Sequence, residues 1–260
     1  DKGQHSGKKI SFSISDAKTK TAYDPDDYLQ INWSEGDAVR IFCDEAEDVK
    51  QADYTVAQIV KNTGKLADNE NGLAWGGNDD VHNFYAVYPA DNNVIAGMTD
   101  GKVTINANTD QICTLGSKVG NMYETTPDMS NAIMVAKSST KPVETVALTF
   151  KPIMTTLEVV VRGAEDDNLA ETYITGISIS MNTSDYGASS KQFIYNLKTD
   201  KLERGATNSS VQFFVGIKNT TDGTNSLHLN AKESVKLTAF LPPVSINDAN
   251  KIKIRVHATG

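Results

Sequence analysis

Carboxylates form the clearest clusters of side chains that could do chemistry. Three aspartates lie in the segment Asp24–Asp27, and the pair Asp79–Asp80 follows the segment WGGN. Carboxylate oxygens at such spacing can bind calcium. Asp-Pro and Gly-Gly-Asn-Asp are also common in turns, and residues 68–72 lack the repeated ligands and the distal glutamate of a calcium loop. The pattern therefore favours turns over a calcium site.

Histidine and cysteine do not form a metal-ligand pattern. The four histidines lie far apart, without the spacing that zinc sites require: His5, His82, His228 and His257. The two cysteines, Cys43 and Cys113, both stand in strand-like segments. They could form one disulfide or remain as two buried thiols.

Catalytic motifs are absent from the sequence as well. It contains no Gly-x-Ser-x-Gly elbow, phosphate-binding loop or dinucleotide fingerprint. A glycoside hydrolase would need two carboxylates facing a cleft, about 5–9.5 Å apart, and the sequence identifies no such pair. We therefore expect a protein that is not an enzyme and that needs neither a metal nor a cofactor.

Aromatic residues suggest a different kind of site. Four of them could stack on sugar rings: Trp33, Trp75, Tyr85 and Tyr88. In alternating strands, however, such side chains more often belong to the core. Binding of glycans through exposed aromatic residues is therefore the alternative function.

Composition and charge exclude several classes of partner. The 260 residues include 39% hydrophobic and 22% charged residues, as in a globular protein, with a net charge of -8. An acidic surface repels phosphate backbones and anionic lipids, so we expect no nucleic acid as a partner. No apolar run approaches the roughly 18 residues that span a bilayer. Because the sequence starts without Met or a signal peptide, we expect it to lack its targeting segment.

Alternation with a period of two recurs along the chain and predicts an all-β fold. Short runs rich in β-branched and aromatic residues are separated by turn dipeptides such as Asp100-Gly101 and Asp222-Gly223. One β-sandwich holds on the order of 100 residues, which predicts two sandwiches in tandem. A polar break at Lys141 and Pro142 divides them into residues 1–141 and 142–260.

The first predicted strand has one apolar and one polar face. Ile10, Phe12 and Ile14 alternate with lysine and serine, which predicts a strand at a sandwich edge. Residues 16–21 follow without a large apolar side chain and contain Lys18 and Lys20. We therefore expect an accessible loop that a trypsin-like protease can cleave. An ordinary edge strand with a polar loop would give the same pattern.

Four segments, in this order, resemble the fimbrillin-like proteins of Bacteroides-type bacteria. Residues 19–23 (TKTAY) and 31–42 (INWSEGDAVRIF) are similar to the family's amino-terminal signature. Residues 84–89 (FYAVYP) resemble its Phe-x-Ala-x-Tyr-Pro strand. Residues 146–159 are similar to the opening of the second domain, and residues 237–243 (LTAFLPP) to a strand near its end.

This resemblance implies a fold and a function. The fold would be two transthyretin-like Greek-key β-sandwich domains in tandem. The function would be that of a structural or adhesive subunit of fimbriae, exported as a lipoprotein to the outer membrane and cell surface. The alternative would be a surface lipoprotein that binds glycans through exposed aromatic residues and does not polymerise. Its partners would be other pilus subunits and a host or bacterial surface ligand. Assembly would follow proteolytic removal of the first strand, whose core face is Ile10, Phe12 and Ile14.

The sequence also departs from the family pattern. Many members carry arginine at the cleavage point, where this chain has Lys18 and Lys20. The sequence also stops at Gly260, one or two strands earlier than expected, so a role of the carboxyl end as a donor strand stays open.

Overall fold

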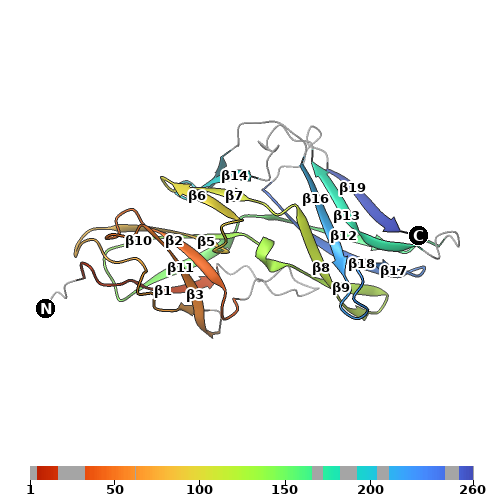
Figure 1. Cartoon of the computed structure of the whole chain (residues 1–260), viewed down its shortest axis with the longest axis horizontal. Helices are drawn as coiled ribbons and strands as arrows, with labels where there is room; N and C mark the ends of the chain where they lie inside the picture. The colour runs from red at the N-terminus through yellow and green to blue at the C-terminus, as the bar shows by residue number, and fades with distance from the viewer. Residues whose placement is uncertain are drawn as a thin grey trace. The chain divides into compact units, whose positions relative to one another are not determined.

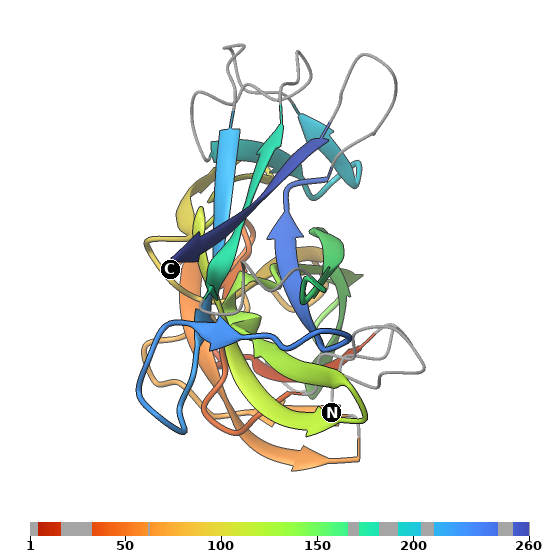
Figure 2. The same ribbon diagram turned by 90° about the vertical axis from the view of Figure 1, so that its right-hand side faces the viewer.

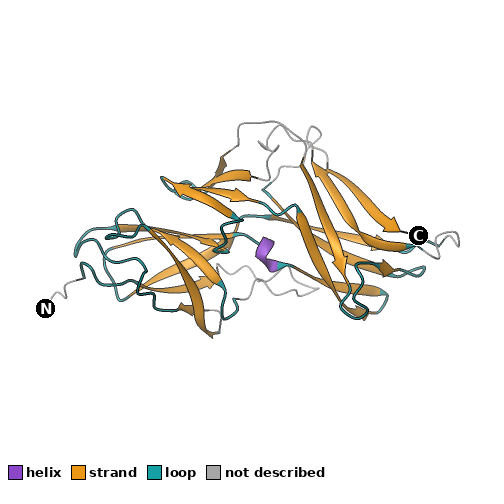
Figure 3. Cartoon of the chain, in the orientation of Figure 1, coloured by secondary structure: helices purple, strands orange, loops and turns teal. Residues whose placement is uncertain are grey.

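The computed structural model describes residues 5–16, 33–61, 63–165, 172–181, 192–203, 211–243 and 252–259. These residues form strands, connecting loops and one short 3-10 helix, η1 (Met129–Asn131) (Figure 3). The fold is therefore all-β, as the alternation predicted.

The chain divides into two compact units, each built from separate stretches of sequence. Unit 1 comprises Asp1–Val103, Ile133–Ile153 and Asn196–Lys201, and unit 2 comprises the remainder. This division differs from the one expected at residue 141. Lys141 and Pro142 turn the chain between two paired strands of unit 1, and the chain leaves this unit only after Ile153.

Unit 1 is a closed barrel of seven strands (Figure 1). In spatial order these are β1 (Ser11–Asp16), β11 (Thr145–Pro152), β10 (Met134–Thr140), β5 (His82–Tyr88), β2 (Ala38–Phe42), β3 (Gln51–Val60) and β4 (Thr63–Leu66). Both faces of β5 are largely buried, which explains its apolar residues at consecutive positions. The first half thus differs from the expected sandwich, because β1 joins β4 and β11 and closes the sheet.

Unit 2 is built on an eight-stranded sheet. Its order is β12 (Thr155–Arg162), β18 (Ser234–Leu241), β9 (Met122–Pro127), β8 (Asp110–Val119), β16 (Val211–Lys218), β13 (Tyr173–Met181) and β17 (Leu227–His228), and β19 (Ile252–Thr259) also pairs with β13. Figure 2 shows β19, in dark blue, along β13. Alternate residues such as Ile177, Ile179, Phe213 and Val215 are fully buried and form the core.

A third sheet has the order β15 (Lys201–Glu203), β14 (Gln192–Asn196), β7 (Lys102–Asn106) and β6 (Ile95–Thr99). The turn between β6 and β7 has positive φ at Asp100 (52°) and Gly101 (72°). Two consecutive positive φ values are what a two-residue hairpin turn requires. The turn predicted from the dipeptide Asp100-Gly101 is therefore confirmed.

Candidate functional site

The candidate site is the position of β1 in the barrel of unit 1. β1 runs parallel to β11, with Ser11 opposite Thr145 and Ile14 opposite Leu148. On its other side it runs antiparallel to β4, with Ile14 opposite Gly64. The sequence predicted an edge strand, and this was wrong. An interior position requires pairing with β11, about 130 residues later, and no local pattern reveals such a partner.

The residues before β1 continue this attachment. The backbone N–H of Ile10 donates to the carbonyl of Leu73 (3.0 Å), and that of Trp75 donates to the carbonyl of Lys8 (3.0 Å). The Gly7 N–H donates in turn to the Trp75 carbonyl (2.8 Å). The segment from Gly7 to Asp16 is thus bonded along its length to unit 1.

The apolar face of this segment fills the barrel core. Ile10, Phe12 and Ile14 are 5%, 1% and 1% exposed. The Phe12 ring contacts Tyr54 and Phe84 edge to face, at centroid distances of 5.0 and 5.5 Å. Burying three such side chains stabilises the fold by roughly 5–9 kcal/mol as an upper bound.

Gly64 makes room for one of these side chains. A Cβ atom added to Gly64 would lie 2.9 Å from Cγ1 of Ile14 and 3.3 Å from Cγ1 of Val56. A side chain at this position would collide with Ile14. We call the space that β1 occupies between β4 and β11 the slot. Because residue 64 is a glycine, the slot has room for a branched side chain opposite it.

The other face of β1 is polar and partly exposed. The hydroxyls of Ser15 and Thr149 lie 3.3 Å apart, and Nζ of Lys9 donates to the Gly72 carbonyl at 2.9 Å. These contacts lie on the outside of the barrel. Only the inner face of β1 is specified by tight packing.

Tyr54 lines the same part of the core. Its hydroxyl accepts a hydrogen bond at 2.7 Å from the N–H of Leu73, the same residue whose carbonyl accepts from the Ile10 N–H. Burial raises the pKa of the Tyr54 phenol to about 12, because the phenolate would lose its hydration. The phenol is therefore a neutral core group at physiological pH.

Comparison with known proteins identifies the family. The family model described as fimbrillin-like matches residues 19–260 of this chain. The chain belongs to the fimbrillin-like family. Among curated proteins, none matches significantly.

Solved structures of two Bacteroides proteins share the fold of this fimbrillin-like chain at low sequence identity, and a third structure is less similar. A candidate cell adhesion protein of Bacteroides uniformis is 16% identical, with a TM-score of 0.52 over 97% of this chain and 84% of that chain. One from Bacteroides ovatus is 12% identical, with a TM-score of 0.52 over 98% and 86%. A fimbrial assembly protein of Parabacteroides distasonis is 14% identical, with a TM-score of 0.42 over 95% and 81%.

The two lysines expected at the cleavage point, Lys18 and Lys20, lie outside the described residues. So do the aspartates of the segment 24–27. Within the described ranges, no three His, Cys, Asp or Glu side chains gather as metal ligands do. The part of the fimbrillin-like chain that the structure describes also holds no helix long and apolar enough to cross a membrane.

The aromatic residues considered for sugar stacking belong mostly to the core. Trp33, Trp75 and Tyr88 are 6%, 1% and 8% exposed, and Tyr85 is partly exposed. Trp33 contacts Tyr88 and Phe150 edge to face at 5.2 and 5.1 Å. The expectation that such aromatic side chains belong to the core is confirmed for the two tryptophans and Tyr88, which therefore have no exposed face for stacking on a sugar ring.

One histidine and both cysteines are buried inside the protein. His82 is fully buried, with Nε2 accepting from the Gly76 N–H at 3.0 Å. Cys43 and Cys113 are both free thiols and buried, which resolves the open question of a disulfide. Burial raises the pKa of the Cys43 thiol to about 12 and also raises the pKa of Cys113, so neither is an activated nucleophile.

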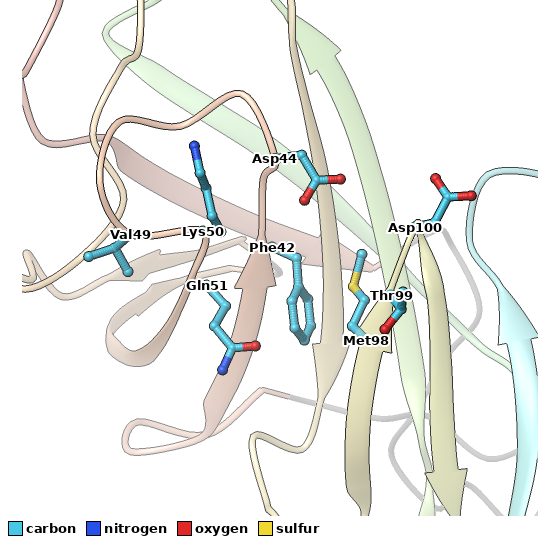
Figure 4. A pocket seen from close by; sticks show the side chains of 8 residues that line it. All are labelled: Phe42, Asp44, Val49, Lys50, Gln51, Met98, Thr99 and Asp100. Carbon is cyan, nitrogen blue, oxygen red and sulfur yellow. The ribbon is translucent and has the colours of Figure 1, made fainter.

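An open depression of about 390 Å³ in unit 1 was not predicted from the sequence. It is lined by Phe42, Asp44, Val49, Lys50, Gln51, Met98, Thr99 and Asp100 (Figure 4). In this view the Phe42 ring and the Met98 side chain lie in the middle, with the carboxylates of Asp44 and Asp100 above them. Lys198 already pairs with Asp100. The mixed lining does not identify a class of ligand.

Proposed function

We propose that this chain is a subunit of cell-surface fimbriae and that it assembles by replacement of β1 after proteolysis near Lys18 and Lys20. The observation that carries this function is the placement of β1, which is bonded on both sides and fills the barrel core with three side chains. The family of the chain supports the same function.

The slot of β1 cannot stay empty after the strand leaves. Its loss would open two rows of backbone groups, on β4 and on β11, and expose the apolar surface that covers Phe12. A whole domain is stable by only about 5–15 kcal/mol, comparable with the burial energy of the strand. A strand from another subunit can satisfy both open edges and fill the core.

Replacement in this slot builds a fibre. The strand that enters belongs to a different surface of the next subunit, so the contact is head-to-tail. Such a contact repeats without closing and gives a linear polymer. The family model begins at residue 19, just after β1, so the part of the chain that resembles the family is the part that would remain after cleavage.

Several finer features belong to the same proposal. The two units are related to transthyretin-like Greek-key domains, with the sheet of unit 1 closed into a barrel by β1, a description supported by their almost entirely β structure. The chain is exported as a lipoprotein, lies at the cell surface and binds other pilus subunits. It acts as a structural or adhesive protein and not as an enzyme.

Limited proteolysis of the purified protein tests this function. Trypsin should cut after Lys18 or Lys20 and the nicked protein should form polymers visible by light scattering and electron microscopy. A Lys18→Ala/Lys20→Ala variant should resist cleavage there and stay monomeric. Lys201→Ala, which removes a lysine from β15, is the matched control and should assemble normally. Polymers of the double variant at the normal rate would exclude cleavage at this loop as the trigger.

A further inference from the structure

The outer face of the sheet in unit 2 carries an aromatic ring above two glycines. Phe214 of β16 is partly exposed, whereas its neighbours Phe213 and Val215 are fully buried. Gly216 is the next outward position on β16, and Gly176 of β13 pairs with it. A Cβ atom added to Gly176 or Gly216 would lie 3.0 or 3.1 Å from the Phe214 ring. The ring thus lies close above both glycines, and at Gly176 the carbonyl oxygen of Val215, 2.3 Å from such a Cβ, also excludes a side chain.

Neighbouring polar side chains hold this ring in place. His257 of β19 contacts it edge to face, with ring centroids 5.6 Å apart. Nε2 of His257 lies 2.8 Å from Oγ of Ser178, the residue opposite Phe214 in the β13–β16 pair. Ser178 is only 2% exposed. These residues, Phe214, Gly176, Gly216, Ser178 and His257, form what we call the Phe214 platform.

Basic side chains lie beside the platform on the same face. In the β13–β19 register, Arg255 lies opposite Ser178 and Lys253 opposite Ser180. Directly opposite residues of antiparallel strands share one face of the sheet. Lys218 continues the outward positions of β16. All three basic residues are exposed, and none has an ion-pair partner within the described part of the chain.

This local charge contrasts with the protein as a whole, whose net charge is -8. Next to β16, Asp110 of β8 lies opposite Phe214 and adds one negative charge beside these three cations. Unpaired cations beside an aromatic ring attract a small anion that also has an apolar face. A long polyphosphate would instead be repelled by the acidic remainder of the protein.

We propose that the Phe214 platform binds a short oligosaccharide that carries a carboxylate. The apolar C–H face of a sugar ring packs against Phe214, as apolar surfaces do on aromatic rings. The guanidinium of Arg255 donates two hydrogen bonds to the carboxylate, a geometry that Arg matches better than Lys does. Lys253 adds a second positive charge. The site lies wholly in unit 2 and binds in the uncut monomer, so it is independent of strand replacement.

Calorimetric titration of the uncut monomer tests this assignment with defined probes. The acidic probes are 3′-sialyllactose and trigalacturonate, and lactose is the neutral counterpart of the first. We expect at least one acidic probe to bind at least tenfold more tightly than lactose. Phe214→Leu and Arg255→Gln should each weaken this binding at least tenfold. Lys65→Gln makes the same change of charge at an exposed position of β4 and should leave binding within twofold.

Further variants separate binding from structure, because an aromatic ring over strand glycines also stabilises a sheet. Phe214→Tyr keeps the ring and should bind as the native protein does. Arg255 is exposed, so Arg255→Gln should keep the native circular dichroism spectrum even where Phe214→Leu does not. Failure of both acidic probes to bind more tightly than lactose would overturn the proposal. So would unchanged binding by Arg255→Gln, or binding of a single-stranded oligo-dT that the same variants abolish.

Discussion

Phe12→Ala is the sharpest test of how β1 stabilises unit 1. The ring is 1% exposed and contacts Tyr54 and Phe84 edge to face. Removing it forfeits about 1.5–3 kcal/mol of burial and about 0.5–1.5 kcal/mol for each aromatic contact. Phe→Ala replacements in cores cost about 3–5 kcal/mol, and we expect a loss in this range.

Tryptophan fluorescence during urea unfolding measures this loss in unit 1 alone. The chain has two tryptophans, and both Trp33 and Trp75 belong to unit 1. The measurement uses protein with Lys18 and Lys20 changed to alanine, so that the chain stays uncut. Ser13→Ala, on the outer face of β1, is the matched control and should change stability by less than about 0.5 kcal/mol.

The outcome for the cut protein distinguishes a replaceable strand from an ordinary core strand. A synthetic peptide of residues 8–16 should bind the trypsin-treated chain after its own strand is removed. The same peptide with Phe12→Ala should bind far more weakly. A loss below about 1 kcal/mol for Phe12→Ala in the uncut protein would show that the Phe12 ring does not anchor β1 in the core, since many single substitutions cost that much without removing a core side chain.

Two further predictions concern the walls of the slot. Gly64→Ala places a Cβ atom 2.9 Å from Cγ1 and 3.2 Å from Cδ1 of Ile14, so we expect urea unfolding to show a loss of about 1–3 kcal/mol. Ile14→Ala in the same chain removes both atoms, so the two substitutions together should cost less than the sum of their separate losses. The pKa of Tyr54 is raised to about 12 in the folded protein, whereas an unfolded tyrosine titrates near pH 10. Between these values the folded state keeps a proton that the unfolded state loses, so unfolding experiments should show stability falling by about 2–3 kcal/mol as pH rises from 10 to 12. This dependence should be much smaller in Tyr54→Phe, and an unchanged pH profile would contradict a buried phenol.

The sequence was informative where a structural feature depends on neighbouring residues. Alternation at Ile10, Phe12 and Ile14 has a period of two, and all three side chains lie on one buried face. The Asp100-Gly101 turn was predictable because glycine and aspartate tolerate positive φ. Both features need only a few adjacent residues.

Features that depend on distant partners were not predictable. The parallel pairing of β1 with β11 joins segments about 130 residues apart, and nothing in either segment specifies the other. The domain boundary failed for the same reason. A polar break such as Lys141-Pro142 marks a turn, but a turn inside one unit and a link between two units have the same composition.

The aromatic residues show a third limit of sequence-based prediction. Trp75 and Phe214 both stand in apolar surroundings in the sequence, yet Trp75 is buried and Phe214 lies on an outer face. What distinguishes Phe214 is the pair Gly176 and Gly216, which come together only through the β13–β16 register. Glycines within predicted strands were the available signal, because they often mark a close approach of another group.

The slot also constrains which strand can replace β1. It is asymmetric, because β11 runs parallel to β1 whereas β4 runs antiparallel. Backbone pairing alone would accept a strand in either direction. The side-chain positions are more selective, since the space above Gly64 lies at one end of the slot and the rings that contact Phe12 lie nearer the middle. An incoming strand with a branched residue and an aromatic residue two positions apart fits in one direction only, with the branched residue opposite Gly64. If β1 is replaced as we propose, the direction of the resulting fibre follows from packing in the core of unit 1.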